Sequence, residues 1–246
     1  MISFANLRAG LAASLAASLG ALLLSLSFAG FASAHTIWLE REGDGVRLYF
    51  GEFDENLREA SPGLLDRLKP EAKVAGSDTA LKVDKTAGFF AVTGTVAPDD
   101  SVVAENVAIN ERRGERPTKV LNRLGARTVA DFKERPATNT LDIVPAGKPG
   151  LFKVFYQGKP LAKAKLELIA ESGWKREFKT DEQGAVEASM PWRGGYVIEV
   201  QHTDATPGKM GEEAYDSIRC ASTLFFRVAE GMQGPLQPPL VTPKRN

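Results

Sequence analysis

Two histidines are the residues of this chain with the clearest potential for metal chemistry. The chain has 246 residues, and its two histidines are His35 and His202. A cut after Ala34 would make His35 the first residue of the mature protein. Its α-amine and its imidazole Nδ1 would then chelate one metal ion, because an α-amine with a pKa near 8 gives up its proton readily. The imidazole of His202 would complete a three-nitrogen site that suits Cu(II) and is tolerable for Ni(II).

The segment after His202 offers further ligands. Asp204 follows two residues later, so its side chain shares a face with His202 if the predicted strand continues. An oxygen of Asp204 would then bind axially. Tyr215 and Asp216, in the long loop 203–217, are weaker candidates for groups that support these ligands. The alternative is that His202 is an ordinary strand-end residue bonded to a backbone carbonyl.

Three glutamates form a second constellation. Glu52, Glu55 and Glu59 are spaced three and four residues apart, which would place them on one face of a helix, where they could bind a hard cation. A solvated surface is the favoured interpretation of the same pattern. The three tryptophans of the chain are expected to pack in a core or a turn rather than to stack on sugars.

The first residues have the pattern of a secretory signal peptide. A single Arg8 precedes residues 9–31, which carry no charged side chain, and the small residues 32–34 follow. A transmembrane anchor is the alternative, because the run is long enough to span a bilayer. Its richness in Ala, Gly and Ser and the lack of a basic cluster after it favour cleavage. We therefore expect a periplasmic or secreted protein that does not span the membrane after cleavage.

Composition excludes several classes of function. The 31 basic and 31 acidic residues balance, which argues against a nucleic-acid-binding surface. The single cysteine, Cys220, excludes an internal disulfide and a Cys-based zinc site, and its apolar surroundings predict a buried thiol. The sequence contains no nucleophile elbow, phosphate-binding loop or dinucleotide fingerprint, so we do not expect an enzyme.

Nearly every periodic segment after residue 35 favours strands over helices. We expect one short helix at 61–69, which begins with Ser61 and Pro62. The predicted fold is all-β, with two β-sandwich domains of the immunoglobulin-like or Greek-key type. The predicted divisions are a signal peptide at 1–34, domains at 35–145 and 146–230, and a mobile tail at 231–246. The predicted strands lie at 35–40, 46–50, 80–83, 89–93, 102–108, 128–132, 151–156, 164–169, 175–180, 185–190, 196–202 and 219–228, with a connection at 143–150.

Several short motifs resemble known families. The segment His35–Glu40, with Gly158–Ala162, Thr180–Gly184 and Gly195–His202, resembles an exported bacterial family of unknown function, often described as periplasmic components of cobalt/nickel transport. The Gly-x-Pro-Leu and Thr-Asp-x-x-Gly motifs of the second half resemble the carboxypeptidase-regulatory or transthyretin-like (prealbumin-like) sandwich. The expected ligand set is similar to that of periplasmic copper carriers that begin with histidine.

Two hypotheses for function follow. In the first, the protein is a periplasmic transition-metal-binding protein for Ni, Co or Cu, which serves a membrane transporter or another periplasmic protein. In the second, it is a metal-free β-sandwich module that contacts protein or glycan through its loops. The resemblance favours the first hypothesis.

Overall fold

The structure is a computed structural model that describes residues 35–43, 45–114 and 116–243. The chain from His35 to Asn246 forms one compact unit. The predicted signal peptide, residues 1–34, lies outside the described residues. Within the described part of the chain, no helix has the length and apolar character needed to cross a membrane.

The described residues are almost entirely β-structure, which confirms the predicted all-β class. They contain nineteen strands and one 3-10 helix, η1 (Leu64–Arg67). The strands are β1 (Thr36–Glu42), β2 (Gly45–Glu52), β3 (Leu57–Arg58), β4 (Glu71–Val74), β5 (Ala80–Lys85), β6 (Phe90–Thr93), β7 (Val102–Arg112), β8 (Thr118–Thr128), β9 (Leu141–Pro145), β10 (Leu151–Tyr156), β11 (Lys159–Pro160), β12 (Lys165–Ala170), β13 (Lys175–Lys179), β14 (Ala185–Glu187), β15 (Trp192–Asp204), β16 (Gly208–Met210), β17 (Glu213–Tyr215), β18 (Ser217–Val228) and β19 (Met232–Gln233).

Most strands belong to one large curled sheet. Among the described residues it has thirteen strands, in the order β1-β2-β6-β5-β4-β7-β8-β18-β15-β12-β13, with β3 beside β2 and β19 beside β15. A four-stranded sheet holds β9, β10, β11 and β14, and β16 pairs with β17. Strands β8 and β18 run parallel, and this pair joins the two halves of the chain into one sheet.

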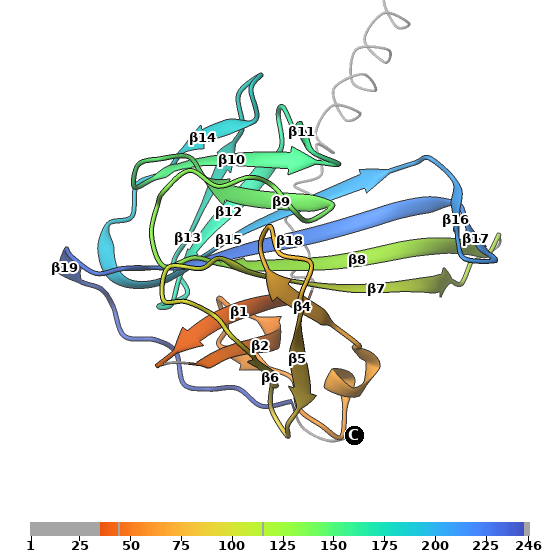
Figure 1. Cartoon of the computed structure of the whole chain (residues 1–246), viewed down its shortest axis with the longest axis horizontal. Coiled ribbons are helices and arrows are strands. Elements are labelled where there is room, and N and C mark those ends of the chain that lie inside the picture. Colours follow the sequence, from red (N-terminus) through yellow and green to blue (C-terminus); the bar gives the residue numbers. More distant parts are fainter. Residues whose placement is uncertain (1–34, 44, 115, 244–246) are drawn as a thin grey trace, which may run out of the picture. The chain divides into compact units, whose positions relative to one another are not determined.

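We call the strands β7, β8, β18, β15 and β12 the central sheet. Figure 1 shows the hairpin of β1 and β2 on one side of it and the strands β9, β10 and β14 on the other. The N-terminal core lies inside the curl of the large sheet and contains Ile37, Leu48 and Val102. The C-terminal core lies between the central sheet and the four-stranded sheet and contains Phe152 and Phe226.

Strand β18 is buried on both faces because both layers pack against it. Phe226 points into the C-terminal core, whereas Phe225 belongs to a third apolar cluster under the β1–β2 hairpin, together with Trp38 and Val197. Cys220, on the first of these faces, is buried as predicted, and burial raises the pKa of its thiol to about 11. A strand with two buried faces has a nearly continuous apolar sequence rather than an alternating one.

Strands β1 and β2 are joined by a tight hairpin turn. Glu42 pairs directly with Gly45, and Gly43 adopts a φ of 57°, which favours glycine. The predicted helix at 61–69 is reduced to the single turn η1. The carboxylate of Asp66 accepts hydrogen bonds from the Gly63 N–H and the Ser61 hydroxyl, which fix the start of this single turn, and the chain leaves the helical conformation at Leu68, two residues before Pro70.

One strand prediction and one predicted connection were wrong in position. The predicted strand at 128–132 is in fact β8, which ends at Thr128. Its charged residues and Gly125 hide the strand pattern, and its place is set by parallel pairing with β18. The predicted connection at 143–150 contains the end of β9, whose five residues are all buried and pair with β10.

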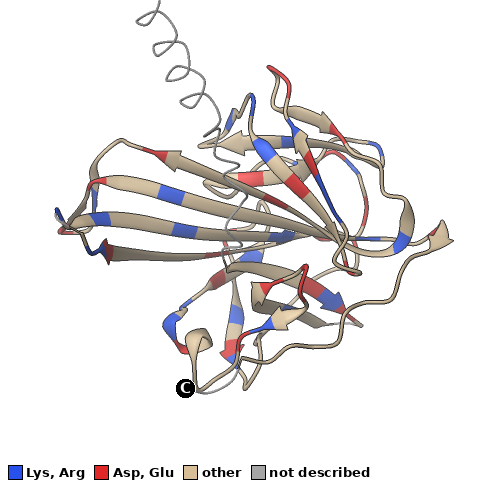
Figure 2. Cartoon of the chain, turned by 180° about the vertical axis from the view of Figure 1, so that it is seen from behind, with Lys and Arg blue, Asp and Glu red and all other residues tan. Residues whose placement is uncertain are grey.

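The predicted boundary at residue 145 coincides with no break in the large sheet, and β9 packs with the C-terminal core. Independent folding of two domains stays a prediction. The predicted mobile tail is placed against the protein: β19 pairs with β15, and Val241 exchanges backbone hydrogen bonds with Asn56 and Arg58. Figure 2 shows that acidic and basic residues are interspersed along the strands.

Candidate functional site

The imidazole of His35 lies between two carboxylates. Its Nδ1 is 3.2 Å from Oε1 of Glu52, and its Nε2 is 2.6 Å from Oε1 of Glu59. The side chain of His35 is 30% exposed, whereas those of Glu52 and Glu59 are 13% and 6% exposed. The ring also packs on Phe50, with 5.3 Å between the ring centroids. The imidazole is therefore held on both sides by enclosed acidic groups.

A tight turn, rather than a helix, brings the two glutamates together. Strands β2 and β3 pair through Gly51 and Arg58, and the Glu59 N–H donates to the Phe50 carbonyl at 2.8 Å. Gly51 has a φ of 149°, and a Cβ atom there would lie 2.1 Å from the Leu57 carbonyl oxygen, so only glycine fits. The three glutamates do not share a helical face, and the favoured interpretation of a solvated surface holds for Glu55 but not for the enclosed Glu52 and Glu59.

The two ring nitrogens of His35 face different carboxylates and can therefore have different roles. A metal-bound histidine usually donates its second ring N–H to a carboxylate, which fixes the ring orientation. Glu59 occupies that position at Nε2, while Nδ1 faces a second carboxylate, Glu52. Nδ1 is the nitrogen that a chelate with the α-amine of the same residue would use.

His202 lies in a different environment. Its ring packs on Tyr156 with 4.4 Å between centroids, and the Tyr156 hydroxyl donates to Asp204 at 2.8 Å. Hydrogen bonds from the hydroxyl and N–H of Thr206, and then from Tyr156, lower the pKa of the Asp204 carboxyl. Burial and the contact with Asp204 raise the pKa of the Tyr156 hydroxyl. Tyr156 therefore links the two predicted ligands on this strand.

His35 and His202 lie on opposite faces of the central sheet. The Thr36 hydroxyl donates to Glu199 at 3.0 Å, so Glu199 points toward β1. His202 is three residues further along β15 and therefore points the other way, toward Tyr156 of β10. The prediction that one ion contacts His35, His202 and Asp204 was wrong for this reason. Among the described residues, no group of three or more His, Cys, Asp or Glu side chains is arranged to hold a metal ion.

Tyr215 and Asp216 anchor a hairpin instead of supporting His202. The Asp216 N–H donates to the Lys119 carbonyl, and its carboxylate accepts from the Lys119 N–H, both at 2.8 Å. The Tyr215 ring covers Gly208, where a Cβ atom would lie 2.4 Å from the hydroxyl. These contacts attach the β16–β17 hairpin to β8. The positions of Tyr215 and Asp216 are therefore explained by a structural role, and no bound ligand is needed to explain them.

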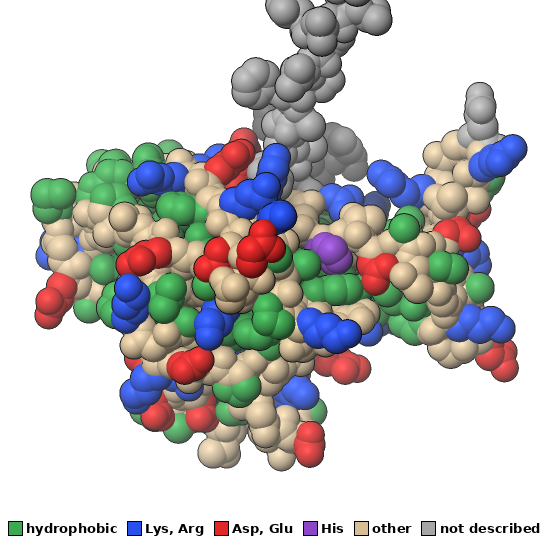
Figure 3. Space-filling view, turned by 90° about the horizontal axis from the view of Figure 1, so that it is seen from above, with side chains coloured by type: hydrophobic (Ala, Val, Ile, Leu, Met, Phe, Trp, Pro, Cys, Tyr) green, Lys and Arg blue, Asp and Glu red, His purple; other side chains and the backbone are tan. Residues whose placement is uncertain are grey.

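The tryptophans pack against protein, as expected. Trp38 is buried and donates from its indole N–H to Glu40 at 2.8 Å. Arg58 also donates to Glu40, and its guanidinium lies 3.8 Å from the centre of the Tyr49 ring. The other two tryptophans pack edge to face with a centroid distance of 5.3 Å. Figure 3, which looks down on the side of β9 and β10, shows hydrophobic and charged side chains intermingled there.

Sequence reasoning missed a carboxylate ladder beneath β1. Glu199 pairs directly with Glu167, which pairs with Glu177 across the next strand. Burial, together with the neighbouring Glu167 and Asp54, raises the pKa of Glu199 to about 7, against the hydrogen bond from Thr36. Burial likewise raises the pKa of Glu167. The alternation within each strand predicts the face on which its glutamate lies. The sequence alone does not give the register between strands that places the three glutamates side by side.

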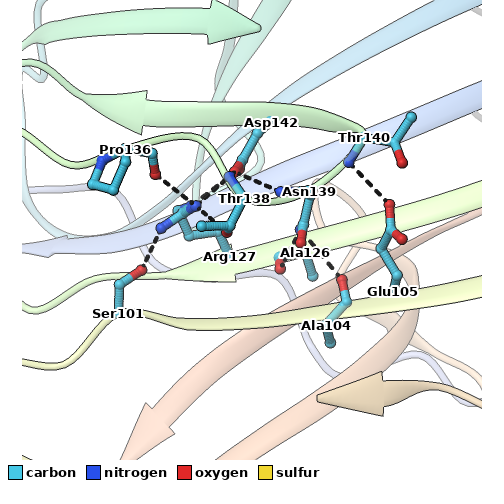
Figure 4. Close-up of polar contacts among 10 residues, drawn as sticks. All are labelled: Ser101, Ala104, Glu105, Ala126, Arg127, Pro136, Thr138, Asn139, Thr140 and Asp142. Atoms are coloured by element: carbon cyan, nitrogen blue, oxygen red, sulfur yellow. Dashed lines mark hydrogen bonds and ion pairs between the residues drawn. The ribbon is translucent and has the colours of Figure 1, made fainter. Parts of the chain in front are cut away.

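A fully buried ion pair on the opposite face was also missed. Arg127 and Asp142 are 0% exposed and form two hydrogen bonds of 3.0 and 2.6 Å. Figure 4 shows Arg127 also donating to Ser101 and Thr138, and Asn139 reaching the strand carbonyls. The network ties β9 and the segment before it to the central sheet, which indicates a structural role. No protein-family model matches the chain, and no curated protein matches it significantly.

Proposed function

We propose that the protein is exported to the periplasm, is cut after Ala34, and binds a divalent transition metal, Ni, Co or Cu, through His35. The observation that carries this proposal is the position of the His35 ring, with Glu52 at Nδ1 and Glu59 at Nε2. We infer that the α-amine freed by the cut, Nδ1 and the Glu52 carboxylate hold the ion, and that Glu59 fixes the ring.

This ligand set differs from the one predicted from the sequence. Glu52 replaces His202 and Asp204, which gives two nitrogens and one oxygen instead of three nitrogens. Carboxylates favour harder ions than imidazoles do, so the exchange moves the preference from Cu(II) toward Ni(II) or Co(II). Delivery of the ion to a membrane transporter, membership of the cobalt/nickel family and the division into two sandwich domains remain proposals that rest on the sequence resemblance.

A metal-free binding module is the second candidate, and one observation favours it. Both ring nitrogens of His35 already have carboxylate partners within 3.2 Å. In this alternative the trio is an ion pair that fixes the start of β1 to the β2–β3 turn, and the protein acts through its surface. The two candidates differ in whether the α-amine of His35 is needed.

Titration of metal into correctly processed protein separates the candidates. Isothermal titration with Ni(II), Co(II) and Cu(II) compares protein that begins at His35 with protein that retains Ala34, in which the α-amine is a peptide nitrogen. We expect the extra residue to weaken binding by about tenfold or more. Glu59→Gln should weaken it by about 10- to 100-fold, since it loosens the ring. Equal affinity of the two lengths would overturn the proposal.

Two controls accompany this titration. His202→Ala should leave the affinity unchanged, because His202 lies on the other face of the central sheet. Intact mass of periplasmic material establishes which residue comes first in the cell. A mature protein that begins at another residue would remove the chelate and leave the metal-free module as the explanation.

A further inference from the structure

Two hydrogen bonds hold the start of β1 on the central sheet. The Thr36 hydroxyl donates to Glu199 at 3.0 Å, and the Thr223 hydroxyl donates to the Ile37 carbonyl at 2.8 Å. Glu199 and Thr223 stand directly opposite one another on β15 and β18, so both bonds come from one place on the sheet. Thr36, Ile37 and Thr223 are buried. The two residues that follow His35 are therefore fixed in position.

The backbone of β1 begins to pair with β2 at the same point. Thr36 pairs directly with Gly51, the residue before Glu52. His35 comes just before this pair, and its ring lies between Glu52 and Glu59. Since side chains of a strand alternate between faces, the ring of His35 and the hydroxyl of Thr36 are held on opposite sides of β1.

These contacts together determine the direction of the third bond at the Cα atom of His35. The two glutamates hold the ring and with it the bond from Cα to Cβ. Thr36 holds the bond from Cα to the carbonyl carbon. Because the Cα atom is tetrahedral and its chirality is fixed, the bond to the backbone nitrogen then has a single direction. Ligand atoms that are ordered before the ion arrives lose little freedom on binding, which raises the affinity.

We propose that Thr36 and Glu199 are positioning residues for the metal at His35. The Thr36 hydroxyl, bound to Glu199, keeps the α-amine that the cut releases directed toward the ion that Nδ1 binds. This inference rests on the proposed function and adds to it a contact on the face of β1 that lies away from the ring. The effect comes from the hydrogen bond, so another group that accepts it should replace the carboxylate.

Titration of Ni(II) into variants of Thr36 tests the inference. In protein that begins at His35, Thr36→Val keeps the shape of the side chain but removes the hydroxyl, and the affinity should fall by about tenfold or more. Thr36→Ser restores a hydroxyl and should recover most of this loss. Thr203→Val, at an exposed position of β15, is the matched control and should leave the affinity unchanged.

Protein that retains Ala34 separates positioning from a general effect on the fold. Its nitrogen at His35 belongs to a peptide bond, so the effect of Thr36→Val on its affinity should disappear. Equal losses in the two chain lengths would show that Thr36 does not act through the amine, and would overturn the inference. Electron paramagnetic resonance of the Cu(II)-loaded protein gives a second readout. Thr36→Val should lose the coupling to the amine nitrogen, which a change in stability alone would not do.

Variants of Glu199 separate the hydrogen bond from the charge. Glu199→Leu removes the acceptor and should lower the affinity as much as Thr36→Val does. Glu199→Gln keeps an oxygen that accepts from Thr36 and should recover most of that loss. Equal losses for the two Glu199 variants would assign the effect to the charge and overturn the inference.

Two further outcomes are decisive. If Thr36→Val does not fold, Thr223→Val removes the hydrogen bond to Ile37 alone, and it should weaken binding only in protein that begins at His35. Equal affinity of the two chain lengths in the unmodified protein would overturn the proposed function and this inference together. A difference between the lengths that Thr36→Val leaves unchanged would overturn this inference alone.

Discussion

The two faces of the central sheet surround their acidic groups differently: Asp142 is fully buried in an ion pair, whereas Glu199 is partly buried beside a second glutamate. Under β9, Asp142 meets the guanidinium of Arg127 with two hydrogen bonds, and further donors complete the network. Under β1, Glu199 receives one hydroxyl hydrogen bond from Thr36 and has Glu167 as its direct neighbour. The first face is neutralised within itself, whereas the second carries negative charge that its own residues do not fully compensate.

The difference shows which face can respond to its surroundings. A buried pair with every donor and acceptor satisfied holds one arrangement and gains little from protons or ions. A carboxylate with a raised pKa changes its charge near neutral pH. The responsive face is the one on which β1 packs, directly after His35.

The largest effect is expected from breaking the neutralised face. Arg127→Ala leaves Asp142 as an unpaired buried charge, so the free energy of unfolding should fall by about 3–5 kcal/mol. Urea denaturation followed by tryptophan fluorescence measures this loss. Arg123→Ala, which breaks a half-exposed pair with Glu105, is the matched control and should cost about 1 kcal/mol. Equal losses would remove the distinction between the buried and the exposed pair.

The second effect concerns the uncompensated face. The folded-state pKa of Glu199, about 7, lies above its ordinary value of 4.5, so the folded protein binds this proton more tightly than the unfolded chain. Its contribution to stability is complete below pH 4.5 and is lost as the pH rises through 7, by up to about 3 kcal/mol. Glu199→Gln should therefore stabilise the protein at pH 7.5 and have little effect at pH 4.5.

Stability curves of both proteins between pH 4.5 and 8 provide this measurement. Glu182→Gln, at an exposed position, should give a curve parallel to that of the unmodified protein. A difference between Glu199→Gln and the unmodified protein that stays constant over this range would contradict the expected ionisation.

The smallest effect is expected at Tyr156. Tyr156→Phe removes the hydroxyl that donates to Asp204 but keeps the ring that packs on His202. The loss should be about 1 kcal/mol, the usual contribution of a single hydrogen bond. This variant changes only the face of the central sheet that carries His202. The metal affinity at His35, on the other face, should therefore not change. Denaturation and metal titration of the same variant test both statements.

Local pattern predicted most of the strands, because alternation and turn residues act over a few positions. It placed β10 and β1 well, where short runs of apolar residues end at turns that contain glycine. It failed at β9 and β8, where Pro145 and Gly125 resemble loop residues and long-range pairing determines the structure.

Sequence analysis identified His35 as a residue of the candidate site, but it did not identify the glutamates that contact it. His35 was identified by its place after Ala34. Glu59 depends on the turn that returns the chain from β2, and contact of Thr36 with Glu199 spans 163 positions of sequence. No local pattern carries that information. His202 was misplaced because a strand pattern does not tell which layer covers which face.

The segment after β19 has a consequence for how the protein is handled in the laboratory. The Pro238 carbonyl accepts a hydrogen bond from the side chain of Asn56. The backbone of Val241 donates to the Asn56 carbonyl and accepts from the Arg58 N–H. That loop carries Glu52 on one arm and Glu59 on the other. Removing the last dozen residues, or fusing a bulky reporter protein to them, would therefore disturb the position of both glutamates. The environment of His35, more than two hundred positions earlier in the sequence, would change as a result.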